Sequence, residues 1–242
     1  MKKRKTKVVE RLQKTAVELM DLQRENLRIR NELPNIYPGR LNSLGQPLQY
    51  ILAKNLFCKT SYDVGVDCAA SLQRRGRKRK KTVYPDIIVL QKKSRGVYVL
   101  KSVIDVKLDL GWLNVDFYGI KKQNNGAYTY RRRTSKFLKG QMEFIRSSRF
   151  TYKIKNDQNE VEQIREVEIP KEGVKRLAIL FMKQNSHGRE VAYENAMVDA
   201  GYEFLLVLNK GNIRKPKDRK IVLDEIANNQ LIDKTLRSFY RK

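Results

Sequence analysis

Two neighbouring apolar segments, residues 84–90 and 97–107, constrain the fold of this chain more than any other feature. β-Branched and aromatic residues dominate both segments, and turn-forming residues occupy positions 92–96 between them. The sequence therefore predicts two strands joined by a short turn. Because successive side chains in a strand point to opposite faces, Asp105 and Lys107 share one face of the second strand.

A second acid, Asp86, follows Pro85 at the beginning of the first strand, and the hairpin would bring it close to Asp105. The two carboxylates and the backbone carbonyl of Val106 are oxygen ligands of the kind that a hard divalent cation prefers. The Lys107 ammonium could then activate a water or balance developing negative charge. This equipment suits hydrolysis of a phosphodiester bond. Charged residues that keep a strand face soluble are the plain alternative for so short a pattern.

The motif Pro85-Asp86, eighteen intervening residues and then Asp105-Val106-Lys107 resembles the signature of the PD-(D/E)xK, or restriction-endonuclease-like, nuclease superfamily. In element order the resemblance covers roughly residues 46–210. It implies an α/β fold with a restriction-endonuclease-like mixed central sheet flanked by helices. It also implies that Asp86 and Asp105 ligate Mg²⁺, for which Mn²⁺ can substitute. The Val106 carbonyl would complete the ligand shell, and Lys107 would orient or activate the water.

One departure from the family concerns a third acid. Many members add a Glu from the helix before the first strand, but the helix predicted at residues 46–57 contains no acid. Asp63 or Asp67 could take this role, or the site could use a single metal ion. If neither holds, a binding-only relative becomes the better interpretation. Gln141, on a helix predicted at 135–147, is a further auxiliary candidate, because the family often uses the helix after the catalytic strands.

The charge balance of the chain points to a polyanionic partner. The 52 Lys and Arg against 26 Asp and Glu give a formal charge of +26. Nucleic acid is the first candidate and an anionic membrane the second. The membrane is disfavoured because apolar runs such as residues 178–182 are far shorter than the roughly twenty residues of a membrane-spanning helix. We expect no membrane partner.

The N-terminal sequence does not suggest a signal peptide, because the basic residues 1–5 precede mixed polar sequence rather than an apolar stretch. The two cysteines, Cys58 and Cys68, form no disulfide or zinc pattern and suggest buried residues in a reducing compartment. We therefore expect a cytoplasmic protein, with a prokaryotic or phage origin as an assumption. The single histidine, His187, argues against His-rich zinc chemistry.

Two basic clusters are candidates for DNA binding. The first occupies seven of eight positions immediately before the Pro85-Asp86 motif, where it could clamp the nucleic-acid backbone; a nuclear-import signal is the competing interpretation. Its members are Arg74, Arg75, Arg77, Lys78, Arg79, Lys80 and Lys81. The second consists of Arg131, Arg132 and Arg133. Between them, aromatic residues at 111–130 could stack on bases, although a role in the core is the more common one.

The N-terminal residues 6–32 predict one long helix, followed by a connector over 34–45 that is rich in Pro and Gly. Apolar residues recur along it at spacings of three and four, which indicates a coiled-coil seam and a dimerisation element. The seam is Val8, Leu12, Thr15, Leu19, Leu22, Asn26 and Ile29. An amphipathic helix lying on its own domain is the alternative. We therefore divide the chain into residues 1–45 and a nuclease-like domain at 46–242.

Further elements complete the predicted α/β arrangement. A strand is predicted at residues 62–66. A hairpin inserted around 149–170 gathers many of the acids, so we expect it to face away from DNA or to contact a basic surface of a partner, and a plain solvated edge is the more common explanation. Two buried strands at 174–182 and 203–208 with a crossover helix between them predict a parallel unit. A closing helix is predicted over 224–240.

The resemblance and the charge together predict a Mg²⁺-dependent DNA endonuclease of the restriction and phage-defence type. We expect double-stranded DNA as the substrate and a homodimer in which each subunit cuts one strand. A structure-specific nuclease of repair, recombination or transposition is one alternative. A non-catalytic nucleic-acid-binding protein, including an RNA-binding component of a larger particle, is another. The sequence leaves open whether a methyltransferase or other protein partner accompanies the chain.

Overall fold

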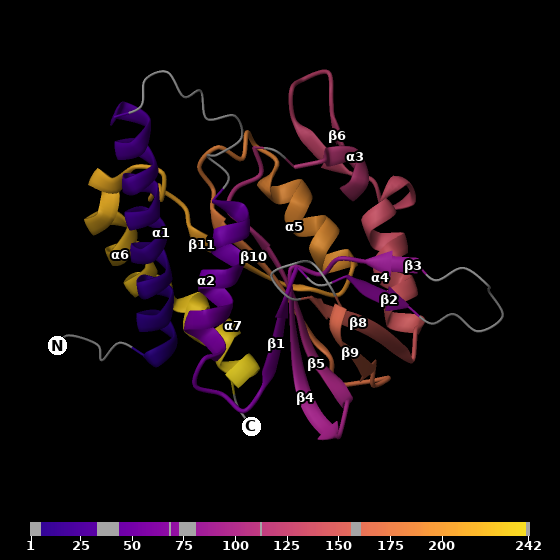
Figure 1. Ribbon diagram of the computed structural model, residues 1–242. Helices are drawn as coiled ribbons and strands as arrows, with labels where there is room; N and C mark the ends of the chain where they lie inside the picture. Colours follow the sequence, from indigo (N-terminus) through magenta and orange to yellow (C-terminus); the bar gives the residue numbers. More distant parts are fainter. Residues whose placement is uncertain are drawn as a thin grey trace.

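The computed structural model describes residues 6–32, 44–67, 69–72, 81–111, 113–155 and 161–240. These residues form a mixed α/β fold in which helices flank a mostly antiparallel nine-stranded sheet (Figure 1). No described helix combines the length and apolar character needed to cross a membrane.

The first half of the chain contributes two helices and the strands that carry the motif. In chain order these are α1 (Lys7–Glu32), α2 (Gly45–Phe57), β1 (Asp63–Val66), β2 (Ala70–Leu72), β3 (Lys81–Val83), β4 (Ile87–Ser94) and β5 (Val97–Lys107). β4 begins later than predicted, since Pro85 has no backbone N–H for a strand ladder. It also runs further, so that the turn is only Arg95 and Gly96, with φ of +76° at the glycine.

The second half alternates short strands with helices. Its elements are α3 (Val115–Tyr118), β6 (Ile120–Lys122), β7 (Tyr128–Tyr130), α4 (Lys136–Arg146), β8 (Arg149–Lys155), β9 (Val161–Glu168), β10 (Lys175–Met182), α5 (Glu190–Asp199), β11 (Glu203–Leu208), α6 (Arg219–Asn228) and α7 (Gln230–Tyr240). Short 3₁₀ turns lie at Arg132–Thr134 and Pro216–Asp218. The predicted closing helix is two helices, because Asn229 adopts an extended conformation with ψ of 99°.

β5 is the central strand of the sheet. β4 pairs antiparallel along one of its edges. Along the other edge, β9 pairs parallel with its beginning and β10 pairs parallel with its end. β10 and β11 are also parallel and joined by α5, which confirms the predicted crossover unit. The predicted hairpin at 149–170 is present as β8 and β9, but it is part of the central sheet: β8 pairs with β2, and Phe150 and Val167 are fully buried.

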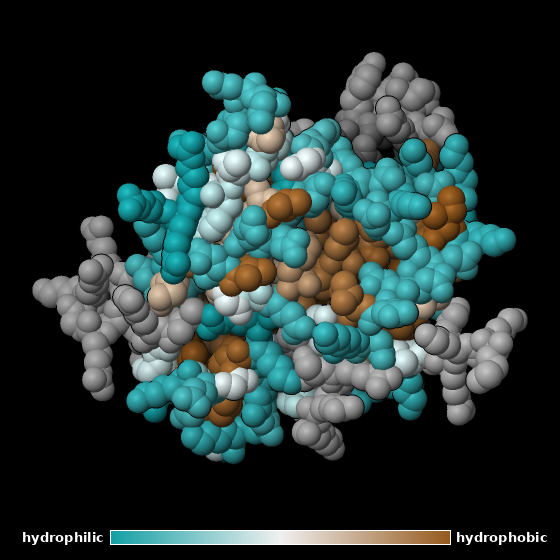
Figure 2. All heavy atoms as spheres, turned by 180° about the vertical axis from the view of Figure 1, so that it is seen from behind, coloured by the Kyte–Doolittle hydropathy of each residue, from teal (hydrophilic) through white to brown (hydrophobic). Residues whose placement is uncertain are grey.

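The two faces of the sheet have separate cores. Helices α1, α2, α6 and α7 cover one face, where Ile104 and Val106 are buried (Figure 1). Helices α3, α4 and α5 cover the other face, where Val103 is buried. By strand alternation, Asp105 and Lys107 lie on the same side as Val103. Figure 2 shows the molecule from behind: hydrophilic residues cover most of this surface, and hydrophobic residues gather in a central patch.

Helix α1 has the predicted extent, and its apolar side belongs to the core of the same chain. Leu12, Thr15 and Leu19 of the predicted seam are fully buried, together with Ala16 and Met20. Contacts with α2, α6 and α7 cover this side. The packing is that of an amphipathic helix on its own domain, and these seam positions are occupied within the chain. Whether the protein dimerises through another surface stays a prediction. Cys58, predicted to be buried, is exposed because it lies just past the end of α2.

Candidate active site

Asp86, Asp105 and Lys107 meet at one end of the central strand. The Lys107 Nζ atom lies 2.8 Å from Asp86 Oδ2 and 3.1 Å from Asp105 Oδ1. Their side chains are 14 to 25% exposed, so the group is sheltered but reachable from solvent. The structure therefore brings together the three residues that the sequence motif singles out.

Strand register explains how Asp86 reaches this position. Ile87 is the first residue of β4 and pairs with Ile104, so no residue of β4 pairs with Val106. The Asp86 carboxylate replaces a strand partner at this position, because its Oδ2 accepts a hydrogen bond of 2.7 Å from the Val106 N–H. In an extended strand the carbonyl of a residue points to the same edge as its N–H. The Val106 carbonyl therefore lies on the edge of β5 that faces Asp86.

A buried tyrosine holds the second acid. The Tyr193 hydroxyl, from α5, donates a hydrogen bond of 2.6 Å to Asp105 Oδ1, and Tyr193 is fully buried. Two further tyrosines, Tyr118 and Tyr202, are buried nearby, and Tyr202 donates a hydrogen bond of 3.0 Å to Gln141 Oε1. Sequence reasoning did not identify Tyr193, on α5, or Tyr202, just before β11, because a tyrosine among apolar neighbours has the pattern of an ordinary core residue.

The charges at this site perturb one another. Burial raises the pKa of Asp86 above its ordinary value of 3.8, and the nearby Asp105 carboxylate raises it further, while Lys107 opposes the change. Burial by itself would lower the pKa of Lys107, but the carboxylates of Asp105 and Asp86 outweigh it and raise that pKa well above its ordinary value. Burial and Asp105 also raise the pKa of Tyr193, which keeps its hydroxyl a hydrogen-bond donor.

These acidic and basic side chains line a cleft of about 360 Å³ between the sheet and helices α3 and α4. Its walls are largely aromatic, and its polar members besides the motif residues are few. The lining residues include Tyr84, Phe117, Tyr118, Phe137, Phe144 and Tyr202, together with Lys136 and Gln141. Gln141, the auxiliary candidate, therefore shares one cleft with Asp86, Asp105 and Lys107.

The other two auxiliary candidates lie differently. Asp63 pairs with Leu90, further along β4 from Asp86, and its carboxylate forms an ion pair of 3.5 Å with Arg165. Asp67 is adjacent to the site through its backbone, because its N–H donates a hydrogen bond of 2.9 Å to the Asp86 carbonyl. Its side chain is exposed, and Asp67 is absent from the residues that line the cleft.

The donor set at the cleft suits a small, hard cation. Asp86, Asp105 and the Val106 carbonyl offer oxygen only, and Mg²⁺ commonly binds through one or two carboxylates while keeping several waters. Burial first and the Asp105 carboxylate second raise the pKa of Asp86, and a divalent cation would relieve the repulsion between the two acids. Among the described residues, no group of three or more His, Cys, Asp or Glu is placed to hold a metal. The set therefore fits a magnesium ion that keeps part of its water shell.

The basic candidates divide between described and undescribed parts of the chain. Residues 73–80, with all but one member of the first cluster, lie outside the described residues. Lys81 begins β3, two residues before Val83 at the cleft. Arg131, Arg132 and Arg133 are exposed and lead into α4, which forms one wall of the cleft. Arg132 also forms an ion pair of 3.3 Å with Asp199.

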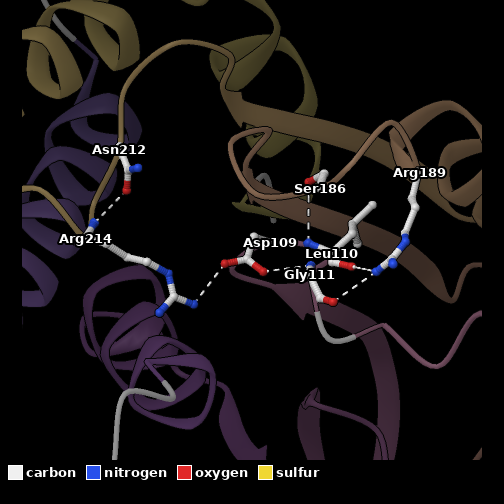
Figure 3. Close-up of polar contacts among 7 residues, drawn as sticks. All are labelled: Asp109, Leu110, Gly111, Ser186, Arg189, Asn212 and Arg214. Atoms are coloured by element: carbon white, nitrogen blue, oxygen red, sulfur yellow. Dashed lines mark hydrogen bonds and ion pairs between the residues drawn. The ribbon is translucent and has the colours of Figure 1, made fainter.

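A polar network fixes the chain directly after Lys107 (Figure 3). Asp109 accepts hydrogen bonds of 2.9 Å from Arg214 and from the Gly111 N–H. Arg189, just before α5, donates to the carbonyls of Leu110 and Gly111 at 2.7 and 3.0 Å. The network joins the end of β5 to the beginning of α5. It therefore fixes the strand that carries Asp105 relative to the helix that carries Tyr193.

Comparison of the chain with protein families, with curated proteins and with solved structures finds no match.

Proposed function

We propose that this protein is a Mg²⁺-dependent DNA endonuclease with a restriction-endonuclease-like fold, of the restriction and phage-defence type. The observation that carries the proposal is that carboxylate oxygens of Asp86 and Asp105 both lie within 3.1 Å of the Lys107 Nζ atom. This group lines the cleft of a strongly basic protein. Two carboxylates and an ammonium at this spacing are suited to phosphodiester hydrolysis.

The order of the elements supports the assignment. Helix α2, strands β1, β4 and β5, helix α4 and strand β10 follow one another in the order that the resemblance to the superfamily implies. The acids stand at the start of β4 and near the end of β5, as the motif requires. Strands β2, β3, β8 and β9 extend this central unit on one side.

The chemistry assigns a role to each side chain. Asp86, Asp105 and the Val106 carbonyl would hold Mg²⁺, which supplies activation of water and neutralisation of phosphate charge. The raised pKa of Lys107 keeps its ammonium charged, so it would orient the water or stabilise a phosphate oxygen. Tyr193 would hold the Asp105 carboxylate in place, because its hydroxyl donates a hydrogen bond to Asp105 Oδ1.

A non-catalytic nucleic-acid-binding protein is the second candidate. The observation that favours it is the lack of a third acid near Asp86 and Asp105 among the described residues. In such a protein the Lys107 ammonium would simply neutralise the two acids, and the charge of +26 would provide the affinity for nucleic acid.

The experiment is a cleavage assay on the full-length protein. Supercoiled plasmid is incubated with the protein in Mg²⁺ or in EDTA, and Lys107→Ala is compared with Lys92→Ala, an exposed lysine on β4 outside the cleft. We expect Mg²⁺-dependent cleavage that Lys107→Ala reduces by about 100-fold or more and Lys92→Ala leaves intact. If the unmutated protein cleaves none of a varied set of DNA molecules in Mg²⁺ or Mn²⁺ but still binds them, the second candidate is correct.

A further inference from the structure

The walls of the cleft are more aromatic than a site for phosphate alone requires. Phe117 on α3 is 41% exposed, and Tyr84, two residues before Asp86, is 67% exposed. Exposed apolar rings scattered singly over a surface are ordinary, but exposed rings that gather at one groove indicate a binding site. Both rings line the same cleft as the two acids and Lys107.

We propose that this cleft is a subsite for one unpaired nucleobase beside the phosphodiester to be cut. The inference rests on the proposed nuclease function and narrows its substrate to nucleic acid that presents an unstacked or extruded nucleotide. It favours recognition of a structure, such as a bulge, flap or mismatch, over the uninterrupted duplex that a restriction-type enzyme cuts. The inference therefore keeps the proposed nuclease chemistry and replaces the restriction type with the structure-specific alternative.

The size of the cleft fits one nucleotide. Its volume of about 360 Å³ lies in the range of about 300–1,000 Å³ that is typical of small-molecule sites. The aromatic wall around Phe117 is held in place: the Phe117 ring lies 5.3 Å from Tyr118 and 6.0 Å from Phe137, both in edge contacts. Tyr118 and Phe137 are buried, so they fix Phe117 from behind while its outer surface stays free for stacking.

Polar groups suited to a nucleotide stand at the same cleft. The exposed Lys136, at the beginning of α4, can pair with a phosphate, and exposed Arg131 and Arg133 precede it in the chain. Gln141 uses its Oε1 to accept the Tyr202 hydroxyl, which leaves its amide N–H groups for the acceptors on a base edge. The site thus combines a face for stacking, a donor for a base edge and positive charge for the backbone.

The subsite lies beside the two acids, which links base binding to the proposed catalysis. Asp86 and Asp105 line the same cleft as Phe117 and Tyr84, so a base bound there would place its own phosphate beside the proposed metal ligands. Extruding a base costs least where it is already unpaired, which is a source of selectivity in enzymes that use this mode.

The test measures binding in EDTA, so that no cleavage occurs. The full-length protein is titrated by fluorescence anisotropy with three DNA duplexes of equal length: fully paired, with one unpaired adenine, and with an abasic site in place of that adenine. Because stacking on an aromatic residue strengthens the binding of a base, we expect the unpaired adenine to bind about tenfold more tightly than the abasic duplex. 2-Aminopurine at the unpaired position should lose fluorescence on binding.

Variants locate the effect. Phe117→Ala and Tyr84→Ala should each reduce the preference for the unpaired base, while the protein remains folded because both rings are partly exposed. Tyr50→Ala is the matched control, since Tyr50 is 52% exposed on α2, on the opposite face of the sheet. Equal affinity for the unpaired and abasic duplexes, or equal loss in the Tyr50 control, would overturn the proposal.

The two proposals fail in different ways. Preference for the unpaired base without cleavage in Mg²⁺ would support the subsite and reject the nuclease. Cleavage in Mg²⁺ without this preference would reject the subsite and support the nuclease.

Discussion

At the scale of single residues, Asp86 combines a structural and a chemical role. Its Oδ2 accepts the Val106 N–H at 2.7 Å and the Lys107 ammonium at 2.8 Å. The first bond extends the contact with β5 to the residue just before the beginning of β4, and the second is part of the proposed site. Burial of a carboxylate is unfavourable, as its raised pKa shows, and the structure tolerates it where a cation can compensate.

Tyr193 provides a test of positioning by a buried hydroxyl. Tyr193→Phe removes only the oxygen that bonds Asp105 Oδ1, and loss of such a partner commonly lowers metal affinity or activity by about 10- to 100-fold. We expect a higher Mg²⁺ concentration for half-maximal cleavage. Tyr202→Phe is the control, since its hydroxyl bonds Gln141 instead. An unchanged Mg²⁺ requirement in Tyr193→Phe, or an equal change in the control, would contradict the role.

The raised pKa of Asp86 predicts a pH dependence of stability. Between the ordinary value of 3.8 and the raised value, the folded state holds a proton that the unfolded state has released. The free energy of unfolding therefore falls as pH rises through this window, by at most about 1.4 kcal/mol per pH unit for this group. Asp86→Asn removes the effect. Urea unfolding in EDTA at several pH values measures the free energy of unfolding of both proteins. As pH rises, this free energy should increase for the variant relative to the unmutated protein. A difference between the two proteins that does not change with pH would contradict the assignment.

At the scale of elements, β11 depends on the junction between the last two helices. Among the described strands β11 pairs only with β10, so its other edge is open. Asn229, between α6 and α7, donates hydrogen bonds from Nδ2 to the carbonyls of Leu206 and Val207 at 2.9 and 3.3 Å. The break between the two helices is therefore also a cap on an edge strand.

Replacement of Asn229 tests this cap. Asn229→Ala should lower the free energy of unfolding by about 1–2 kcal/mol, because two strand carbonyls lose a donor. Asn228→Ala is the matched control: Asn228 is the exposed last residue of α6, where alanine should have little effect. Denaturant unfolding of both variants measures the difference. Equal stability of the two would show that the Asn229 side chain contributes nothing.

At the scale of the whole molecule, α1 belongs to the domain that carries the site. Its buried residues share one core cluster with α2, α6, α7 and the face of the sheet behind Asp105. The heptad-like spacing arises because any helix with one buried stripe repeats its apolar residues at three and four positions. A seam of this length does not distinguish a partner helix from the helix's own domain.

Deletion of residues 1–32 tests this architecture. The shortened chain would expose a broad apolar face, so we expect it to lose cooperative unfolding and to associate nonspecifically. Circular dichroism melting and analytical ultracentrifugation of the full-length and shortened chains measure both effects. A shortened chain that is monomeric and melts cooperatively would show that α1 is a dispensable appendage.

The sequence alone determined the features that depend on local patterns. β-Branched and aromatic residues indicated β5, and continuous apolar runs indicated β10 and β11. Helical spacing indicated α1, α2 and α4. The motif selected Asp86, Asp105 and Lys107, because short spacing along a hairpin constrains which side chains can meet. The positive charge likewise follows from composition alone.

Tertiary structure decided what depends on packing between distant segments. Tyr193 is 88 residues from Asp105 in the chain, and only the crossover of α5 over the sheet brings the two together. The same holds for the aromatic cleft, whose walls come from α3, α4 and the segment before β4. The sequence also did not determine the packing partner of α1, because one apolar stripe can pack on its own domain or on another chain. A sequence pattern specifies which side chains will be buried, and the contacts among elements specify which partners those side chains pack against.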